Sequence, residues 1–74
     1  MTKEEYIKAG FNAIQGAVSN DVMESREPKD YNHINNPVGH TLSYLMAYCD
    51  YMDIDFEQEV RIGKDLFNER QELL

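Results

Sequence analysis

The stretch PVGHTLSYLMAYCDYM, from Pro37 to Met52, is the longest apolar-rich run in the chain, and the rest of the predicted fold is arranged around it. Its apolar residues recur at steps of four, three, four and three, which places them on one face of a helix. Asn36 is a candidate N-cap, and Pro37 suits the first helical position because its missing N–H would have no partner there. Tyrosines form a second stripe beside the first, so we expect a central core helix packed between neighbours. The first stripe consists of Val38, Leu42, Leu45, Cys49 and Met52, and the second of Tyr44, Tyr48 and Tyr51.

A second helical pattern precedes this run. The segment TKEE, from Thr2 to Glu5, has the pattern of a capping box, in which each side chain bonds the other residue's backbone N–H. Apolar residues at helical spacing then continue to about Glu24, so we expect one long helix after this cap. Gly10 and Gly16 each disfavour helix by roughly 1 kcal/mol relative to alanine, and a break near Gly16 into two shorter helices is the alternative.

A loop and a last helix complete the predicted fold. Residues 26–36 contain Pro28 together with asparagines and an aspartate, which favour turns over helix. Asp55 can cap a final helix, with Gln58 completing a second capping box, and this helix is expected to run to about Gln71. No segment has the alternating pattern of a strand. The sequence therefore predicts a single all-α domain over residues 1–74, with three to four helices.

The chain is short for a self-sufficient core. At 74 residues, a single apolar core rarely contributes more than roughly 3–5 kcal/mol to stability. Its one cysteine excludes an internal disulfide, and no set of Cys and His has the spacing of a zinc site. We therefore expect a homodimer or tetramer that buries Val38, Leu42, Leu45, Cys49 and Met52 between copies.

The charge balance restricts the partners. Fourteen acidic residues against seven Lys and Arg give a net charge of -7, which argues against binding to nucleic-acid phosphate. An acidic surface can hold divalent cations or attract a basic host protein, or it only keeps the protein soluble. No run of about 20 apolar residues occurs, and the N-terminus lacks the apolar core of a signal peptide. We expect no membrane partner and a cytoplasmic location, where unpaired Cys49 would stay reduced.

The first candidate site is a set of polar side chains near the end of the first helical pattern. If the helix continues to Glu24, then Asn20, Asp21 and Glu24 project from one face, because residues three and four apart are neighbours. Mg²⁺ prefers carboxylates, water and phosphate oxygens, so Asp21 and Glu24 are candidate metal ligands, and a solvated acidic face is the alternative. His40, beside Gly39 at the start of the central helix, could ligate a metal, act as an acid or base, or only form hydrogen bonds.

A second candidate site lies near the C-terminus. Lys64 and Asn68 are four residues apart on the last predicted helix, and Arg70 follows them. Such side chains could bind a phosphate or the edge of a base, and the alternative is that the basic residues complement the helix dipole. No serine has a histidine or acid at the spacing of an activated nucleophile, Cys49 lies on the apolar stripe, and no glycine-rich phosphate loop is present.

The order and spacing of these groups are similar to those of a known family. The chain resembles the all-α nucleoside triphosphate pyrophosphohydrolases, the MazG-like and dimeric dUTPase group, over roughly Ala13 to Arg70. That family has an E-E-x-x-E motif on one helix, E-x-x-D at the head of the next, an apolar run of the type G-D-v-l-x-y-l, a turn and a basic tail. The corresponding segments here are NDVME at 20–24, GHTLSYL at 39–45, MDID at 52–55, and the tail residues Lys64, Asn68 and Arg70.

The resemblance implies a helical bundle completed by oligomerisation and a Mg²⁺ site that holds a nucleoside triphosphate. The family's four acids are only partly present, because E-x-x-D falls where Pro37 and His40 stand, and Asn20 replaces the first glutamate of the other motif. Asp21 and Glu24 remain as acids. Activation of water by a metal depends on the full cluster, and each such loss commonly lowers the rate by orders of magnitude. A neutral imidazole is a poor Mg²⁺ ligand beside oxygen donors.

Three hypotheses result. The first is a catalytically degenerate member of this group that serves as a nucleotide-binding or protein-binding module, regulatory or inhibitory, by analogy with small phage or mobile-element proteins that bind a host factor. The second is an active Mg²⁺-dependent pyrophosphohydrolase, and the third is a helical hairpin without this ancestry that homodimerises. The nucleotide pocket would use Asp21, Glu24, Lys64, Asn68 and Arg70, and the active metal site would use Asp21, Glu24, Glu27 and Asp50 or Asp53.

Overall fold

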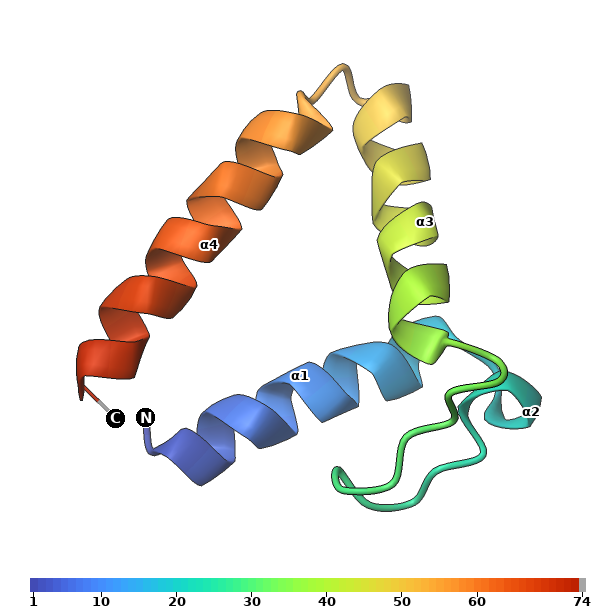
Figure 1. The fold of residues 1–74 in the computed structure, drawn as a ribbon. Coiled ribbons are helices and arrows are strands. Elements are labelled where there is room, and N and C mark those ends of the chain that lie inside the picture. Colours follow the sequence, from blue (N-terminus) through green and yellow to red (C-terminus); the bar gives the residue numbers. More distant parts are fainter. Residues whose placement is uncertain (74) are drawn as a thin grey trace. The chain divides into compact units, whose positions relative to one another are not determined.

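The computed structural model describes residues 1–73, and this part of the chain is all-α, as predicted (Figure 1). It contains four helices, within the predicted three to four, and no strand. The chain divides into two compact units, Met1–Tyr44 and Leu45–Leu74, so their boundary falls inside the third helix. Among residues 1–73, none of the helices combines the length and the apolar character needed to cross a membrane. The helices are α1 (Lys3–Ala17), α2 (Asn20–Met23), α3 (Pro37–Tyr51) and α4 (Phe56–Leu73).

Helix α1 begins with the predicted capping box. The Glu5 N–H donates to the Thr2 hydroxyl over 3.2 Å, and the Thr2 N–H donates to the Glu5 carboxylate over 3.1 Å. The hydrogen bond from the Thr2 backbone N–H holds the pKa of the Glu5 carboxyl below its ordinary value. A hydrogen bond from the Thr2 side chain lowers this pKa further, by a smaller amount. No side chain of α1 is fully buried, and the capping box satisfies backbone N–H groups that the first turn of the helix leaves free.

Acid is expected to open this cap. Because the pKa of Glu5 is lowered by folding, its contribution to stability is present above pH 4.5 and is lost as the pH falls through the lower folded value. The Thr2 amide resonance should therefore shift in NMR spectra with a midpoint below pH 4.5, and Glu5→Gln should remove this titration. A midpoint at or above pH 4.5 would show that the carboxylate is not held by Thr2.

The expectation of one long helix to Glu24 is wrong, and two shorter helices take its place. The break lies at Val18 and Ser19, both of which have extended backbones, whereas Gly16 stays inside α1. Val18 is β-branched and loses side-chain freedom in a helix, and outside the helix its side chain is buried. Val18 at the break and Met23 after it are both buried.

Helix α3 begins at Pro37, as predicted, and Pro37 is fully buried. Asn36 occupies the N-cap position, since its carbonyl accepts the His40 N–H over 3.2 Å. Its side chain, however, donates to the Ile34 carbonyl, and the exposed Val38 N–H donates instead to the Tyr31 hydroxyl over 3.2 Å. The side-chain cap expected from Asn36 therefore comes from Tyr31, because Asn36 is held in the left-handed region at φ 51°.

The end of α3 and the start of α4 follow from local hydrogen bonds. The Ile54 N–H donates to the Cys49 carbonyl over 2.8 Å, and the Asp53 N–H donates to the Asp50 carbonyl over 3.4 Å. With Asp53 at φ 57°, this is the pattern of a Schellman cap. Asp55 then caps α4 as predicted, accepting the Gln58 N–H over 3.2 Å. The reciprocal bond from the Gln58 side chain is not formed in the described residues, so the second capping box is half complete.

The central helix is not covered as expected. Of the first apolar stripe only Cys49 is buried, and the other four side chains, Val38, Leu42, Leu45 and Met52, are between 41% and 50% exposed. The three tyrosines of the second stripe are between 48% and 79% exposed. The buried hydrophobic side chains among the described residues are Val18, Met23 and Cys49, with Pro37. The predicted stripe residues therefore lie on α3 or directly after its last residue. The expectation that this helix is buried between neighbours is wrong, because most of the stripe is exposed in the single chain.

Candidate functional site

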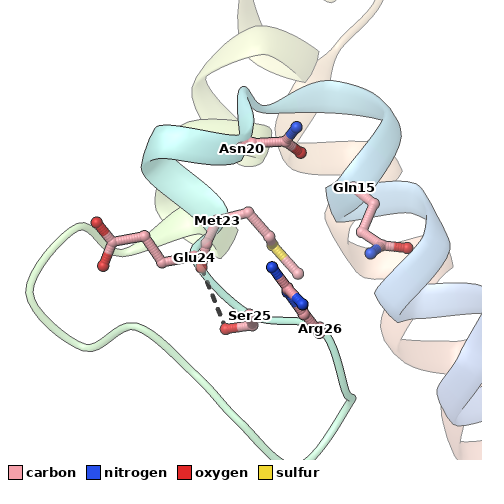
Figure 2. A pocket seen from close by; sticks show the side chains of 6 residues that line it. All are labelled: Gln15, Asn20, Met23, Glu24, Ser25 and Arg26. Atoms are coloured by element: carbon pink, nitrogen blue, oxygen red, sulfur yellow. Dashed lines mark hydrogen bonds between the residues drawn. The ribbon is translucent and has the colours of Figure 1, made fainter.

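The residues of the predicted acidic face lie at helix α2 and its C-cap. Asn20 and Asp21 are its first two residues, and Glu24 is the C-cap, with its N–H donating to the Asn20 carbonyl over 2.8 Å. Glu24 has φ 49°, in the left-handed region, so it has left the helical path. Figure 2 shows its carboxylate directed away from the Asn20 side chain. The expectation that these side chains project together is therefore wrong, because the helix ends one residue before Glu24.

Asn32 connects the following loop to α2. Its amide nitrogen donates to the Glu24 carboxylate over 3.1 Å and to the Val22 carbonyl over 3.3 Å. Its amide oxygen accepts the N–H groups of Ile34 and Asn35 over 3.1 and 3.0 Å. The Asn32 side chain thus uses its amide donors and its amide oxygen to fix the loop. The Glu24 carboxylate is one of the groups that hold Asn32 in place.

The described residues contain no group of three or more His, Cys, Asp or Glu side chains placed to hold a metal ion. Asp21, Glu24 and His40 therefore do not gather into such a group in this structure, although each is exposed. Glu27, which the hydrolase hypothesis adds to the metal site, forms an ion pair with Lys29 over 3.4 Å on the surface. Mg²⁺ binding by Asp21 and Glu24 stays a prediction. In it, the two carboxylates are ligands of the ion, and water and phosphate oxygens occupy the other coordination positions.

His40 lies in the first turn of α3, at the edge of an open hollow of about 510 Å³. Its ring centre is 6.4 Å from that of Tyr44 in a tilted arrangement, and its carbonyl accepts the Ser43 hydroxyl over 2.7 Å. These are the two neighbours that the helical spacing predicts. The remaining lining comes from Ile34, Asn35, Asn36 and Gly39, so the hollow contains no carboxylate that could share a metal with His40.

The predicted basic site lies on α4, in the second unit. Lys64, Asn68 and Arg70 are exposed, and Lys64 and Asn68 share a face of the helix, as expected for residues four apart. Asp21, Glu24 and His40 belong to the first unit. A single nucleotide pocket that combines the two sets therefore stays a prediction.

A cleft between α1 and the segment after α2 was missed by the sequence reasoning. It has a volume of about 550 Å³, and Figure 2 shows the side chains around it. Asn20 and Glu24 had been singled out, but not as members of a cleft. No sequence pattern predicts this cleft, because it forms only where the chain leaves the helix at Val18 and Ser19 and turns again at Glu24. Its lining residues are Gln15, Asn20, Met23, Glu24, Ser25 and Arg26.

Comparison with known proteins finds no matching family model, no similar curated protein and no similar solved structure.

Proposed function

We propose that this chain is a small, non-catalytic binding module that assembles with further copies of itself through the apolar face of α3. The observation that carries the proposal is the exposure of this face. Val38, Leu42, Leu45 and Met52 are each at least 41% exposed and carry no charge, in a chain whose net charge is -7. Large contiguous apolar surfaces on soluble proteins mark interaction sites.

The length of the chain supports a second copy as the occupant. A domain of 74 residues rarely builds a self-sufficient apolar core, and association of identical copies is one way in which such small domains bury more apolar surface. The same face on each copy can make such an interface, because a two-fold contact is self-complementary.

Charge sets the conditions for this assembly. Each copy carries a net charge of -7, so two copies repel each other at low salt while their uncharged apolar faces attract. Added salt screens the repulsion and leaves burial of the apolar face intact. Self-association should therefore strengthen as the salt concentration rises, which is the reverse of what an interface built on ion pairs would show.

The same proposal includes degenerate ancestry in the MazG-like pyrophosphohydrolase group. Two features support loss of chemistry: no three-residue metal-binding group forms among residues 1–73, and Glu24 accepts a hydrogen bond from Asn32. In this proposal Lys64, Asn68 and Arg70 are what remains of a nucleotide-phosphate site. The acidic surface is the part that a basic host protein would contact, with a regulatory or inhibitory result.

Light scattering tests the assembly. We expect a particle mass of about 17 kDa or a higher multiple of the 8.6 kDa chain, increasing in population with salt. A particle that keeps the mass of one chain at micromolar to millimolar concentration and at high salt would overturn the proposal. The chain should be studied over at least a hundredfold range of concentration, because a weak dimer dissociates on dilution.

A hydrolase assay tests the absence of catalysis. We expect incubation with Mg²⁺ or Mn²⁺ and a panel of NTPs and dNTPs to release no pyrophosphate above the blank, because two of the four acids that the resemblance implies for water activation are replaced in this sequence. Release that disappears in Glu24→Ala would establish the active enzyme instead. A shift in thermal stability with a nucleotide, without release, would identify a retained pocket, and its loss in Lys64→Gln would place that pocket on α4.

A further inference from the structure

The cleft between α1 and the segment after α2 brings together polar groups from three separate parts of the first unit. Gln15 comes from the last turn of α1, Asn20 is the first residue of α2, and Arg26 follows the helix. Met23, one of the few buried side chains, lies between them at 4% exposure. At about 550 Å³ the cleft is within the size range of small-molecule sites, which combine an apolar surface with a few convergent polar groups.

Arg26 gives the cleft an uncompensated positive charge. In a chain with 14 acidic residues, this guanidinium forms no ion pair within residues 1–73. The carboxylate nearest in sequence on the cleft wall, that of Glu24, is directed to the other side and accepts a hydrogen bond from Asn32 over 3.1 Å (Figure 2). The left-handed backbone at Glu24 makes this separation, because it turns the acid outward while the chain returns beneath α2 with Arg26.

The neighbouring groups complete a set of N–H donors. The side-chain amides of Gln15 and Asn20 line the same cleft, and neither makes a side-chain hydrogen bond to another described residue. The Ser25 hydroxyl is already used, since it donates to the Met23 carbonyl over 3.1 Å. The cleft therefore offers a planar guanidinium and two free amides, and its only carboxylate is engaged outside it.

We propose that this cleft binds a small ligand through an anionic oxygen group, a carboxylate or a phosphate, that pairs with Arg26 and accepts hydrogen bonds from Gln15 and Asn20. The guanidinium presents two parallel N–H groups that match two oxygens of such an anion, and a charge-assisted pair of this kind is stronger than a neutral hydrogen bond. Met23 is the apolar residue among those that line the cleft, and its side chain is 4% exposed. The proposal does not rest on self-association, because none of the lining residues belongs to the α3 stripe.

An NMR titration of the full chain tests this site. The probes are inorganic phosphate, acetate and AMP, each added to about 20 mM at constant ionic strength. We expect saturable shifts confined to the amide groups of Gln15, Asn20 and Arg26 and their neighbours, and at least about tenfold weaker binding in Arg26→Gln. Lys29→Gln is the matched control, because it removes the same charge three residues away and should leave the affinity unchanged.

The comparison of probes identifies the source of the anion. Tighter binding of AMP than of phosphate indicates a phosphate carried on a nucleoside, and tighter binding of acetate indicates a carboxylate. The proposal is overturned if none of the probes gives saturable shifts at the cleft, or if Lys29→Gln weakens binding as much as Arg26→Gln. Unchanged dispersion of the amide spectrum in both variants shows that they remain folded, and Arg26→Lys, which keeps the charge without the planar fork, should bind with intermediate affinity.

Discussion

Leu45→Glu is expected to convert the proposed assembly into a monomer. Leu45 lies in the middle of the apolar stripe of α3 and is 50% exposed in the single chain, and in the proposed assembly a partner copy buries it. A carboxylate at this position would be taken out of water on both sides of a two-fold interface, at an effective penalty of several kcal/mol per ion. Light scattering at a fixed concentration should then give the mass of one chain, 8.6 kDa.

Ala47→Glu is the matched control for this variant. Two residues further along the same helix, at about 100° per residue, position 47 lies on the opposite face from the stripe and is exposed. Glutamate and leucine have similar helix propensities, so helix content measured by circular dichroism should stay close to that of the unaltered chain in Leu45→Glu. An assembled particle in Leu45→Glu, or dissociation in Ala47→Glu to the same extent, would show that the stripe is not the interface.

Met23→Ala is expected to lower the free energy of unfolding by about 2–3 kcal/mol. Met23 is 4% exposed, and truncation of a buried methionine loses its transfer free energy and leaves a cavity. In a chain of 74 residues, whose core supplies only roughly 3–5 kcal/mol, such a loss leaves a substantial unfolded population at room temperature. Urea denaturation followed by circular dichroism measures the change as a lower midpoint with an unchanged slope.

Two further variants show whether burial is the cause. Met46→Ala removes the same atoms from a side chain that is 50% exposed, and should lower the free energy of unfolding by less than about 1 kcal/mol. Met23→Leu keeps the volume and should recover most of the loss. Equal destabilisation by Met23→Ala and Met46→Ala would contradict the small core described for the first unit. All variants should be compared at one protein concentration, since assembly adds to apparent stability.

Much of the helical architecture could be predicted because it depends on residues close together in the sequence. The Thr2–Glu5 capping box, Pro37 at the first position of α3 and Asp55 at the cap of α4 each involve bonds or dihedrals within about four residues. Side-chain chemistry at these positions satisfies backbone groups that the helix itself leaves free. The same short range explains why the ends of α3 and α4 were predicted to within two residues.

The candidate sites were predicted less well, because their geometry depends on where the chain turns. Asn20, Asp21 and Glu24 were assigned to one helical face, yet Glu24 lies outside the helix and is bound by Asn32, eight residues away. Arg26 falls in the predicted loop, where its sequence neighbours indicate no role for it. Composition identifies which groups are available for chemistry, but the direction of each side chain follows from backbone dihedrals that periodicity does not report.

The sequence by itself determined the all-α class, the caps at the start of α1 and α4, and the membership of the apolar stripe on α3, since these follow from local bonding and from a period of 3.6 residues. Only the tertiary structure decided that the first helix ends at Ala17, that Tyr31 caps α3, and that the stripe remains exposed. Each of these depends on contacts between distant residues or on how much apolar surface one short chain can cover. The helical period identifies which residues share an apolar face. The tertiary structure shows whether the rest of the chain covers that face.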